Sequence, residues 1–156
     1  MNSAAQKALQ AAQGYLELDM PRDAAAELAT IPELEHDRVE IVEMKALIAL
    51  KLDDWEAGLE AASKLCELQP SRPSGFIHTA YCLHELGRTA EARETLLMGP
   101  ASLRDEATFY YNLACYNARL DEDEEALQLL DRAFEMDAKL REMARTDPDL
   151  QSLNLG

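Results

Sequence analysis

The sequence YYNLACYNARLDEDEEALQLLDRAFEM, residues 110–136, contains the pattern that decides the fold. Its apolar periodicity predicts two short amphipathic helices joined by a turn at Asp121. The same features recur every 34 residues toward the N-terminus. The expected turns carry Leu120-Asp121, Leu86-Gly87, Leu52-Asp53 and Leu18-Asp19. Small residues recur in two further series, of which the first is Ala114, Ala80, Ala46 and Ala12. The second series is Ala126, Ala92, Gly58 and Ala24. A repeat of this length predicts stacked helical hairpins.

The repeat predicts an all-α protein that forms a single domain over residues 1–156. We expect a right-handed α-α superhelix of four helix-turn-helix repeats followed by a C-terminal capping helix. The repeats are expected at about residues 5–38, 39–72, 73–106 and 107–140, with a capping tail at 141–156. A terminal repeat has no neighbour to cover its apolar face, so we expect Leu150 and Leu153 of the tail to be buried.

Prolines and polar residues predict where helices end and begin. Pro32 and Pro100 lie two repeats apart and are expected to shorten the second helix of repeats one and three. Asp19 and Ser102 are expected to cap the helices that follow them. The acidic run at residues 121–125 lacks the glycine and the ligand spacing of a calcium loop. We therefore expect it at a helix N-terminus, where the helix dipole favours carboxylates.

The charge of the chain narrows the class of partner. The formal net charge of −15 at pH 7 argues against binding to nucleic acid or to an anionic membrane surface, because phosphates would be repelled. A solvated outer face explains this acidity, and a basic partner is the alternative. The sequence therefore predicts a protein partner and neither nucleic acid nor membrane.

Cysteines and hydropathy indicate the compartment. Cys66, Cys82 and Cys115 cannot all pair, and each lies in an apolar helical pattern without CxxC spacing. The N-terminal segment lacks the apolar core of a signal peptide. The most apolar run, residues 41–52, is interrupted by charges and is too short to span a bilayer. We expect a cytoplasmic protein.

The repeat resembles the tetratricopeptide repeat, a helix-turn-helix unit of 34 residues. In the fourth unit Tyr110 stands where the family has its bulky opening residue, and Leu113-Ala114 where it has Leu-Gly. The other matching residues are Ala126 and Ala133 in the fourth unit, Phe76, Ala80 and Ala92 in the third, Ala46, Trp55 and Pro70 in the second, and Ala12, Tyr15 and Ala24 in the first. Lys45 and Thr79 depart from the family pattern by replacing its leucine.

The resemblance covers about residues 5–150. Its last part, from Leu140 to Leu150, is similar to the closing block of many uncharacterised bacterial proteins of this family. For function the resemblance implies a protein-binding scaffold, because the fold itself does not specify a partner.

The resemblance also implies a binding groove, which the first helix of each pair lines. Its expected lining is Met44, Leu47, Leu50, Ile77, His78, Tyr81, His84, Tyr111, Asn112, Cys115 and Arg119. The aromatic and aliphatic centre of this set suits an apolar or amphipathic peptide. An alternative is that Tyr81 and Tyr111 only pack between neighbouring first helices.

The family also has a carboxylate clamp, a binding mode for acidic chaperone tails that needs lysines, an arginine and asparagines along the groove. Only Asn112 and Arg119 are of a suitable type here, so we do not expect that binding mode.

The sequence contains no strong signal for catalysis or metal binding. It has no glycine-rich phosphate loop, HExxH, GxSxG or CxxC motif. His78 and Cys82 share a helical face, as zinc ligands could, but His84 points elsewhere and no fourth ligand is evident. We therefore expect no enzyme, no metal and no cofactor.

Three hypotheses about function remain open. The first is a non-enzymatic adaptor that holds an apolar or amphipathic peptide of a partner protein in its groove. The second is a small acidic chaperone, similar to those of type III translocators. The third is a structural module that self-associates, for example as a homodimer, by closing the groove with a second copy.

Overall fold

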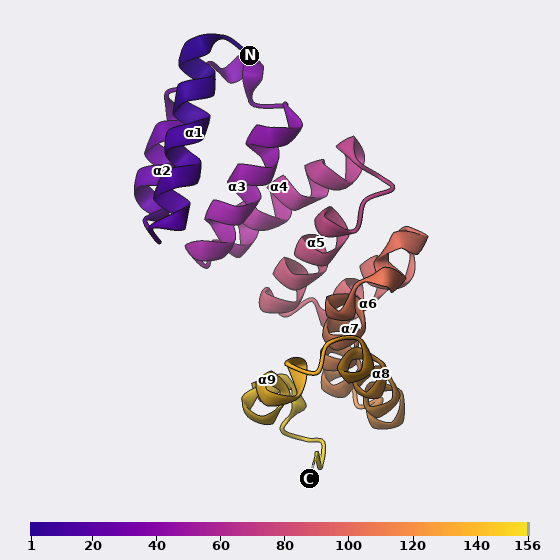
Figure 1. Ribbon diagram of the computed structural model, residues 1–156. Coiled ribbons are helices and arrows are strands. Elements are labelled where there is room, and N and C mark those ends of the chain that lie inside the picture. Colours follow the sequence, from indigo (N-terminus) through magenta and orange to yellow (C-terminus); the bar gives the residue numbers. More distant parts are fainter. Residues whose placement is uncertain (156) are drawn as a thin grey trace. The chain divides into compact units, whose positions relative to one another are not determined.

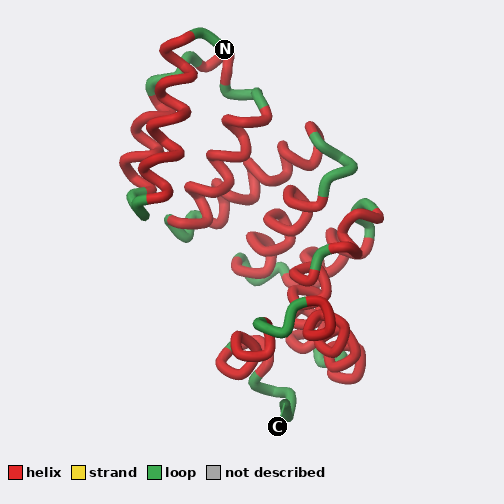
Figure 2. The backbone as a smooth tube through the Cα atoms, viewed as in Figure 1, coloured by secondary structure: helices red, strands yellow, loops and turns green. Residues whose placement is uncertain are grey.

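The structure is a computed structural model that describes residues 1–155 (Figures 1 and 2). This part of the chain is all-α and contains no strand, so the predicted class, an α-α repeat solenoid, is confirmed. The chain divides into two compact units, Met1–Pro70 and the part that begins at Ser71. The single-domain organisation, the repeat boundaries and the right-handed superhelix stay predictions.

Unit 1 (Met1–Pro70) consists of two helical hairpins and a short linker. The elements are α1 (Ser3–Glu17), α2 (Pro21–Ala29), the 3-10 helix η1 (Glu33–Glu35), α3 (Val39–Lys51) and α4 (Trp55–Leu68). Helix α1 packs on α2, and α3 packs on α4 (Figure 1). Helix α2 also contacts α3. Ala12 and Ala24 are fully buried in this core, and such small side chains let the helices approach closely.

Unit 2 repeats this arrangement and adds a tail. Its elements are α5 (Pro73–Glu85), α6 (Thr89–Leu97), the 3-10 helix η2 (Ala101–Asp105), α7 (Ala107–Arg119), α8 (Asp123–Met136), α9 (Leu140–Thr146) and the 3-10 helix η3 (Pro148–Leu150). Helix α5 packs on α6 and α7 packs on α8 (Figure 1). The 3-10 helix η3 docks against α7. Leu150 and Leu153 of the tail are buried, which confirms that expectation.

All four hairpins turn through a residue with left-handed backbone geometry. The φ angles are 58° at Asp19, 54° at Asp53, 81° at Gly87 and 64° at Asp121. Glycine, and less often aspartate, tolerates this region. The following N–H bonds to the carbonyl five residues back, for example Met20 N to Tyr15 O at 2.8 Å, as in a Schellman motif. The turn positions of the 34-residue repeat are therefore the C-terminal caps of the first helices.

Two predicted N-caps are wrong. The residue before α2 is Met20 rather than Asp19, and Asp19 instead takes the left-handed position that ends α1. Ser102 lies inside η2, and its hydroxyl donates to the carbonyl of Ser71 at 2.8 Å. Helix α7 starts after Glu106 without a side-chain cap. Asp19 thus precedes the N-cap position of α2 by one residue, whereas the rest of η2 separates Ser102 from α7.

The predicted shortening of alternate second helices is confirmed. Helices α2 and α6 have 9 residues each, whereas α4 and α8 have 14. Pro32 and Pro100 follow the short helices, and a 3-10 helix begins directly after each proline. The acidic residues 123–125 occupy the first turn of α8, as expected. Over residues 1–155, no helix combines the length and the apolar character needed to cross a membrane.

Candidate functional site

A network of polar contacts joins the tail of unit 2 to the first helices of its two hairpins. Helix α7 contributes Tyr111, Cys115 and Arg119, which are spaced four residues apart and therefore share one face. Helix α5 contributes His84 from its last turn. These side chains meet the carboxylates of Asp147 and Asp149, which flank Pro148 at the start of η3.

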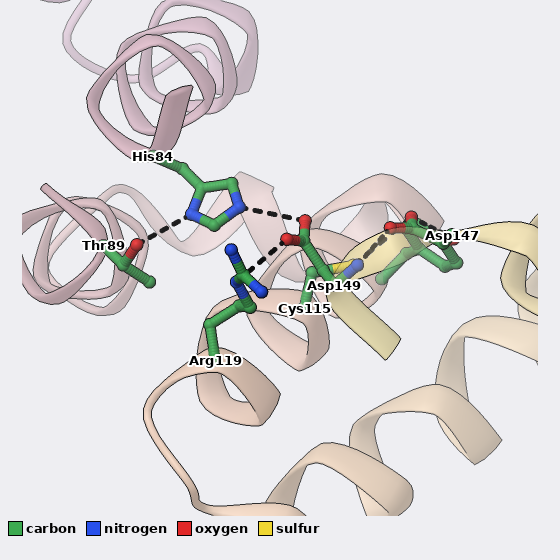
Figure 3. A network of polar contacts seen from close by, with 7 residues as sticks. His84, Thr89, Cys115, Arg119, Asp147 and Asp149 are labelled. Carbon is green, nitrogen blue, oxygen red and sulfur yellow. Dashed lines mark hydrogen bonds and ion pairs between the residues drawn. The ribbon is translucent and has the colours of Figure 1, made fainter. Parts of the chain in front are cut away.

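Asp149 lies between an imidazole and a guanidinium (Figure 3). Its Oδ2 is 2.9 Å from His84 Nε2, and its Oδ1 is 3.3 Å from Arg119 Nε. Because a carboxylate only accepts, His84 Nε2 carries the hydrogen. In the neutral ring Nδ1 then accepts from the Thr89 hydroxyl at 2.8 Å. Both ring nitrogens are thus engaged, which fixes the orientation of the imidazole.

Asp147 is held by two neutral donors of α7 and by the backbone N–H of Asp149. The Tyr111 hydroxyl donates to Oδ2 at 2.7 Å, and the Cys115 thiol donates to the same atom at 3.7 Å. Oδ1 accepts from the backbone N–H of Asp149 at 3.0 Å, which caps η3. The carboxylate therefore orders the tail and anchors it to α7.

The environment keeps the donors of α7 protonated. Burial, assisted by the hydrogen bond to Asp147, raises the pKa of Tyr111. Burial, followed by the charges of Asp147 and Asp149, also raises the pKa of the Cys115 thiol. A nucleophilic cysteine needs the opposite surroundings, which lower its pKa. Cys115 is therefore placed to donate a hydrogen bond and is poorly placed for covalent chemistry.

Three of these residues could form a metal-binding group. The ligand atoms of Cys115, Asp147 and Asp149 lie within 4.8 Å of one another. The carboxylates already accept from Tyr111 and from His84, and Arg119 places a positive charge beside Asp149. A cation would compete with that guanidinium and would need the disfavoured Cys115 thiolate. The contacts fit a hydrogen-bonded network better than a metal centre.

The network borders an open cleft of about 1280 Å³ within unit 2. One wall is formed by the first helices α5 and α7 with the start of α6, and the other by α9 and η3. Residues exposed along it include Tyr81, Glu85, Thr108, Arg119 and Met143. Tyr116 lies below it, with its ring 4.9 Å from the His84 ring. The cleft thus presents both polar and apolar contacts.

The structure brings together six of the eleven residues that were expected to line a groove. These are Tyr81, His84, Tyr111, Asn112, Cys115 and Arg119, which all border the cleft. Ile77 and His78 are half-buried on α5 and do not line it. Met44, Leu47 and Leu50 belong to α3 of unit 1, where Met44 is buried and Leu47 is exposed.

Sequence reasoning missed the role of the two tail aspartates. In the sequence Asp147-Pro148 is typical of the end of a helix, and two carboxylates on either side of a proline were the visible signal of a further role. His78, Cys82 and His84 do not form a group of ligand atoms among the described residues, and His84 instead contacts Thr89 and Asp149. Cys82 is fully buried, and burial with the nearby charge of Glu85 raises the pKa of its thiol to about 11.

The helical hairpins and their turns define a tetratricopeptide-like repeat fold. Among solved structures, the chain is similar to a mutant of MamA, a helical repeat protein of this type, with a TM-score of 0.66. The sequence identity is 20%, and the match covers 83% of this chain and 76% of that chain. No protein-family model and no curated protein matches the sequence. The likeness to MamA confirms the fold.

Proposed function

We propose that the protein is a non-enzymatic adaptor that binds a peptide segment of another protein along the first helices of its hairpins. One observation carries the proposal: the first helices of unit 2 already hold a short segment of the tail, residues 147–149 at the start of η3, through their side chains. A surface that orders its own tail in this way has the donors and the open cleft that peptide recognition requires.

Unit 1 has an exposed apolar surface of its own on the first helix α3. On α3, Leu47 is 43% exposed and Leu50 is half-buried, so this face carries aliphatic contacts without a covering segment of its own unit. An amphipathic peptide would place its apolar side chains here. We extend the proposal to a cytoplasmic location, since Cys66, Cys82 and Cys115 are free thiols, as is usual in a reducing compartment.

The test compares the proposed face with a matched position on a second helix. Leu47→Ala with Tyr81→Ala alters the first helices, whereas Leu127→Ala alters α8 at a leucine of similar exposure, 40% against 43%. Affinity capture followed by binding assays with the purified captured protein should show loss only for the first variant. Equal capture by all three proteins, with their folds intact by circular dichroism, would contradict the proposal.

The two alternatives predict different behaviour of the same samples. A chaperone of the type III translocator kind would form a stable one-to-one complex with a client that is insoluble alone. A self-associating module would show a mass in light scattering that rises with concentration and falls in Leu47→Ala with Tyr81→Ala. The large apolar residues Leu18, Leu34 and Met98 are strongly exposed, but they are dispersed over turns and linkers. The adaptor proposal therefore has the stronger structural support.

A further inference from the structure

We propose that the cleft of unit 2 recognises an acidic partner segment with the pattern Asp-x-Asp-apolar, and that residues 147–150 occupy this site in cis. The inference rests on the proposed peptide-binding function and names the chemistry of the partner. The pattern is taken from the tail itself, in which Asp147 and Asp149 flank Pro148 and Leu150 follows.

Each carboxylate of the tail has a separate pair of donors on the hairpins. Tyr111 and Cys115 donate to Asp147, whereas His84 and Arg119 contact Asp149. These contacts join side chain to side chain, so they do not depend on how the segment is connected to the rest of the chain. A partner segment that forms the same 3-10 turn, and so places two carboxylates at this spacing, could make the same set of contacts.

Charge complementarity selects an acidic occupant. If the tail carboxylates were absent, the wall formed by α5 and α7 would present the guanidinium of Arg119 and the N–H of His84 without acceptors. The Tyr111 hydroxyl and the Cys115 thiol would lose the acceptor that both now contact, Asp147 Oδ2. Buried donors without acceptors are unfavourable, and a neutral or basic segment cannot supply two carboxylates. Glu85 on the rim disfavours additional negative charge beyond these two.

An apolar residue completes the recognised pattern. Leu150 directly follows the second aspartate and is 1% exposed, in η3 where it docks on α7. Burial of a leucine contributes affinity that does not depend on charge, while the carboxylates fix its register. A partner segment therefore needs both aspartates and the apolar residue.

The hold of the tail is local, so exchange with a partner is feasible without unfolding of the hairpins. Helix α9 has 7 residues and η3 has 3, and Met143 and Pro148 are exposed within them. Short terminal segments open more readily than the core. A tethered ligand acts at an effective concentration of the order of mM, so a partner competes with the tail and its apparent affinity is reduced accordingly.

The experiment uses the full chain and a fluorescent peptide with the tail sequence ARTDPDLQSL, residues 144–153. In the variant Asp147→Asn with Asp149→Asn the cis carboxylates are neutral, so we expect the peptide to bind at least about tenfold more tightly than to the wild type. A control with the same change in charge, Asp105→Asn with Asp131→Asn, alters exposed aspartates of η2 and α8 and should match the wild type.

Two further arms establish that the carboxylates are recognised. A peptide in which both aspartates are asparagine should not bind measurably. Adding Arg119→Ala to the asparagine variant should reverse the gain in affinity for the acidic peptide. Equal binding of the acidic and neutral peptides, or equal binding to wild type and variant, would overturn the proposal.

A measurement on the wild type keeps the test decisive if the variant folds poorly. Excess acidic peptide should speed amide hydrogen exchange at residues 140–153 and leave α8 unchanged, because the peptide displaces the tail. Unchanged exchange at saturating peptide would overturn the proposal. A wild-type dimer that is lost in the asparagine variant would place a second copy's tail in the cleft and would also overturn it.

The two proposals fail in different ways. If peptide binding fails but capture still depends on Leu47 and Tyr81, the adaptor function stands and the acidic partner segment is wrong. If capture is insensitive to Leu47 and Tyr81 as well, the adaptor function itself is wrong.

Discussion

Equivalent positions on α3 of unit 1 and α7 of unit 2 have different surroundings. Leu47, Tyr81 and Cys115 are separated by the 34-residue period and occupy the same place on three first helices. Leu47 is 43% exposed and Tyr81 39%, whereas Cys115 is 3% exposed. The repeat therefore leaves this position open, and the tail closes it in the last hairpin.

The difference shows that one face of α7 both receives the cap of the last hairpin and belongs to the proposed binding surface. In a repeat protein the last hairpin needs a cap because no further repeat covers it. Here the cap docks on the first helix α7, the same surface for which we propose binding. The capping contacts are polar and specific at Asp147 and Asp149 and apolar at Leu150. A single segment can thus stabilise unit 2 and compete with a ligand.

The largest expected effect is that of Leu150→Ala, which tests whether the tail stabilises unit 2. This side chain is 1% exposed, so we expect its truncation to lower the free energy of unfolding by about 3 kcal/mol. Leu47→Ala, at the exposed position of α3, should change the free energy of unfolding by about 0.5 kcal/mol or less. Urea unfolding of both variants, followed by circular dichroism, measures the difference. Similar effects for the two leucines would show that the tail does not stabilise unit 2.

A smaller effect is expected for Tyr111→Phe. The change removes the hydroxyl that donates to Asp147 at 2.7 Å and retains the ring, so unfolding free energy should fall by about 1.5 kcal/mol. Tyr110→Phe is the matched control on the same helix, because the contacts of Tyr110 with Phe109 and Arg132 involve its ring. If both substitutions have the same effect, the hydrogen bond to the tail contributes nothing to stability.

Cys115 reports directly on closure by the tail. Replacing Asp147 and Asp149 by asparagine removes the two charges that raise the pKa of its thiol, and it loosens the covering segment. We expect labelling by a thiol reagent to accelerate by about tenfold, because a more exposed thiol with fewer nearby negative charges has a lower pKa and forms the thiolate more readily. Peptide mass spectrometry resolves the site, and Cys82, buried on α5, serves as the internal control. Unchanged labelling of Cys115 would mean that the aspartates do not shield it.

Local features of the fold could be predicted from the sequence because each depends on a few neighbouring residues. Pro32 and Pro100 shorten α2 and α6 because proline lacks the N–H that a helix needs. Leu150 was expected in the core because the terminal hairpin must be covered. Asp19 was misassigned because an aspartate suits both an N-cap and a left-handed turn, and only the backbone geometry separates the two roles.

The candidate site could be predicted only in part. Periodicity selects the face of α7 that carries Tyr111, Cys115 and Arg119, so these residues were found. It does not encode which distant segment covers that face. His84 and Asp149 are 65 residues apart in sequence, and their contact depends on the path of the chain after α8. Pairing across such a separation is a tertiary property, which helical spacing cannot supply.

The smallest expected effect concerns His78, whose register partners are Met44 on α3 and Asn112 on α7. Burial lowers the pKa of His78 from the ordinary value of 6.5, and its Nδ1 has no hydrogen-bond partner among the described residues. The unfolded chain therefore binds a proton at this histidine more readily than the folded chain does. The contribution of His78 to the free energy of unfolding is complete above pH 6.5 and declines as the pH falls below this value. His78→Gln should flatten this decline between pH 7 and about 5, measured as urea midpoints. If the urea midpoint of the variant declines with pH as that of the wild type does, the imidazole of His78 is solvated. This position of α5 would then be open to solvent, as Leu47 is on α3.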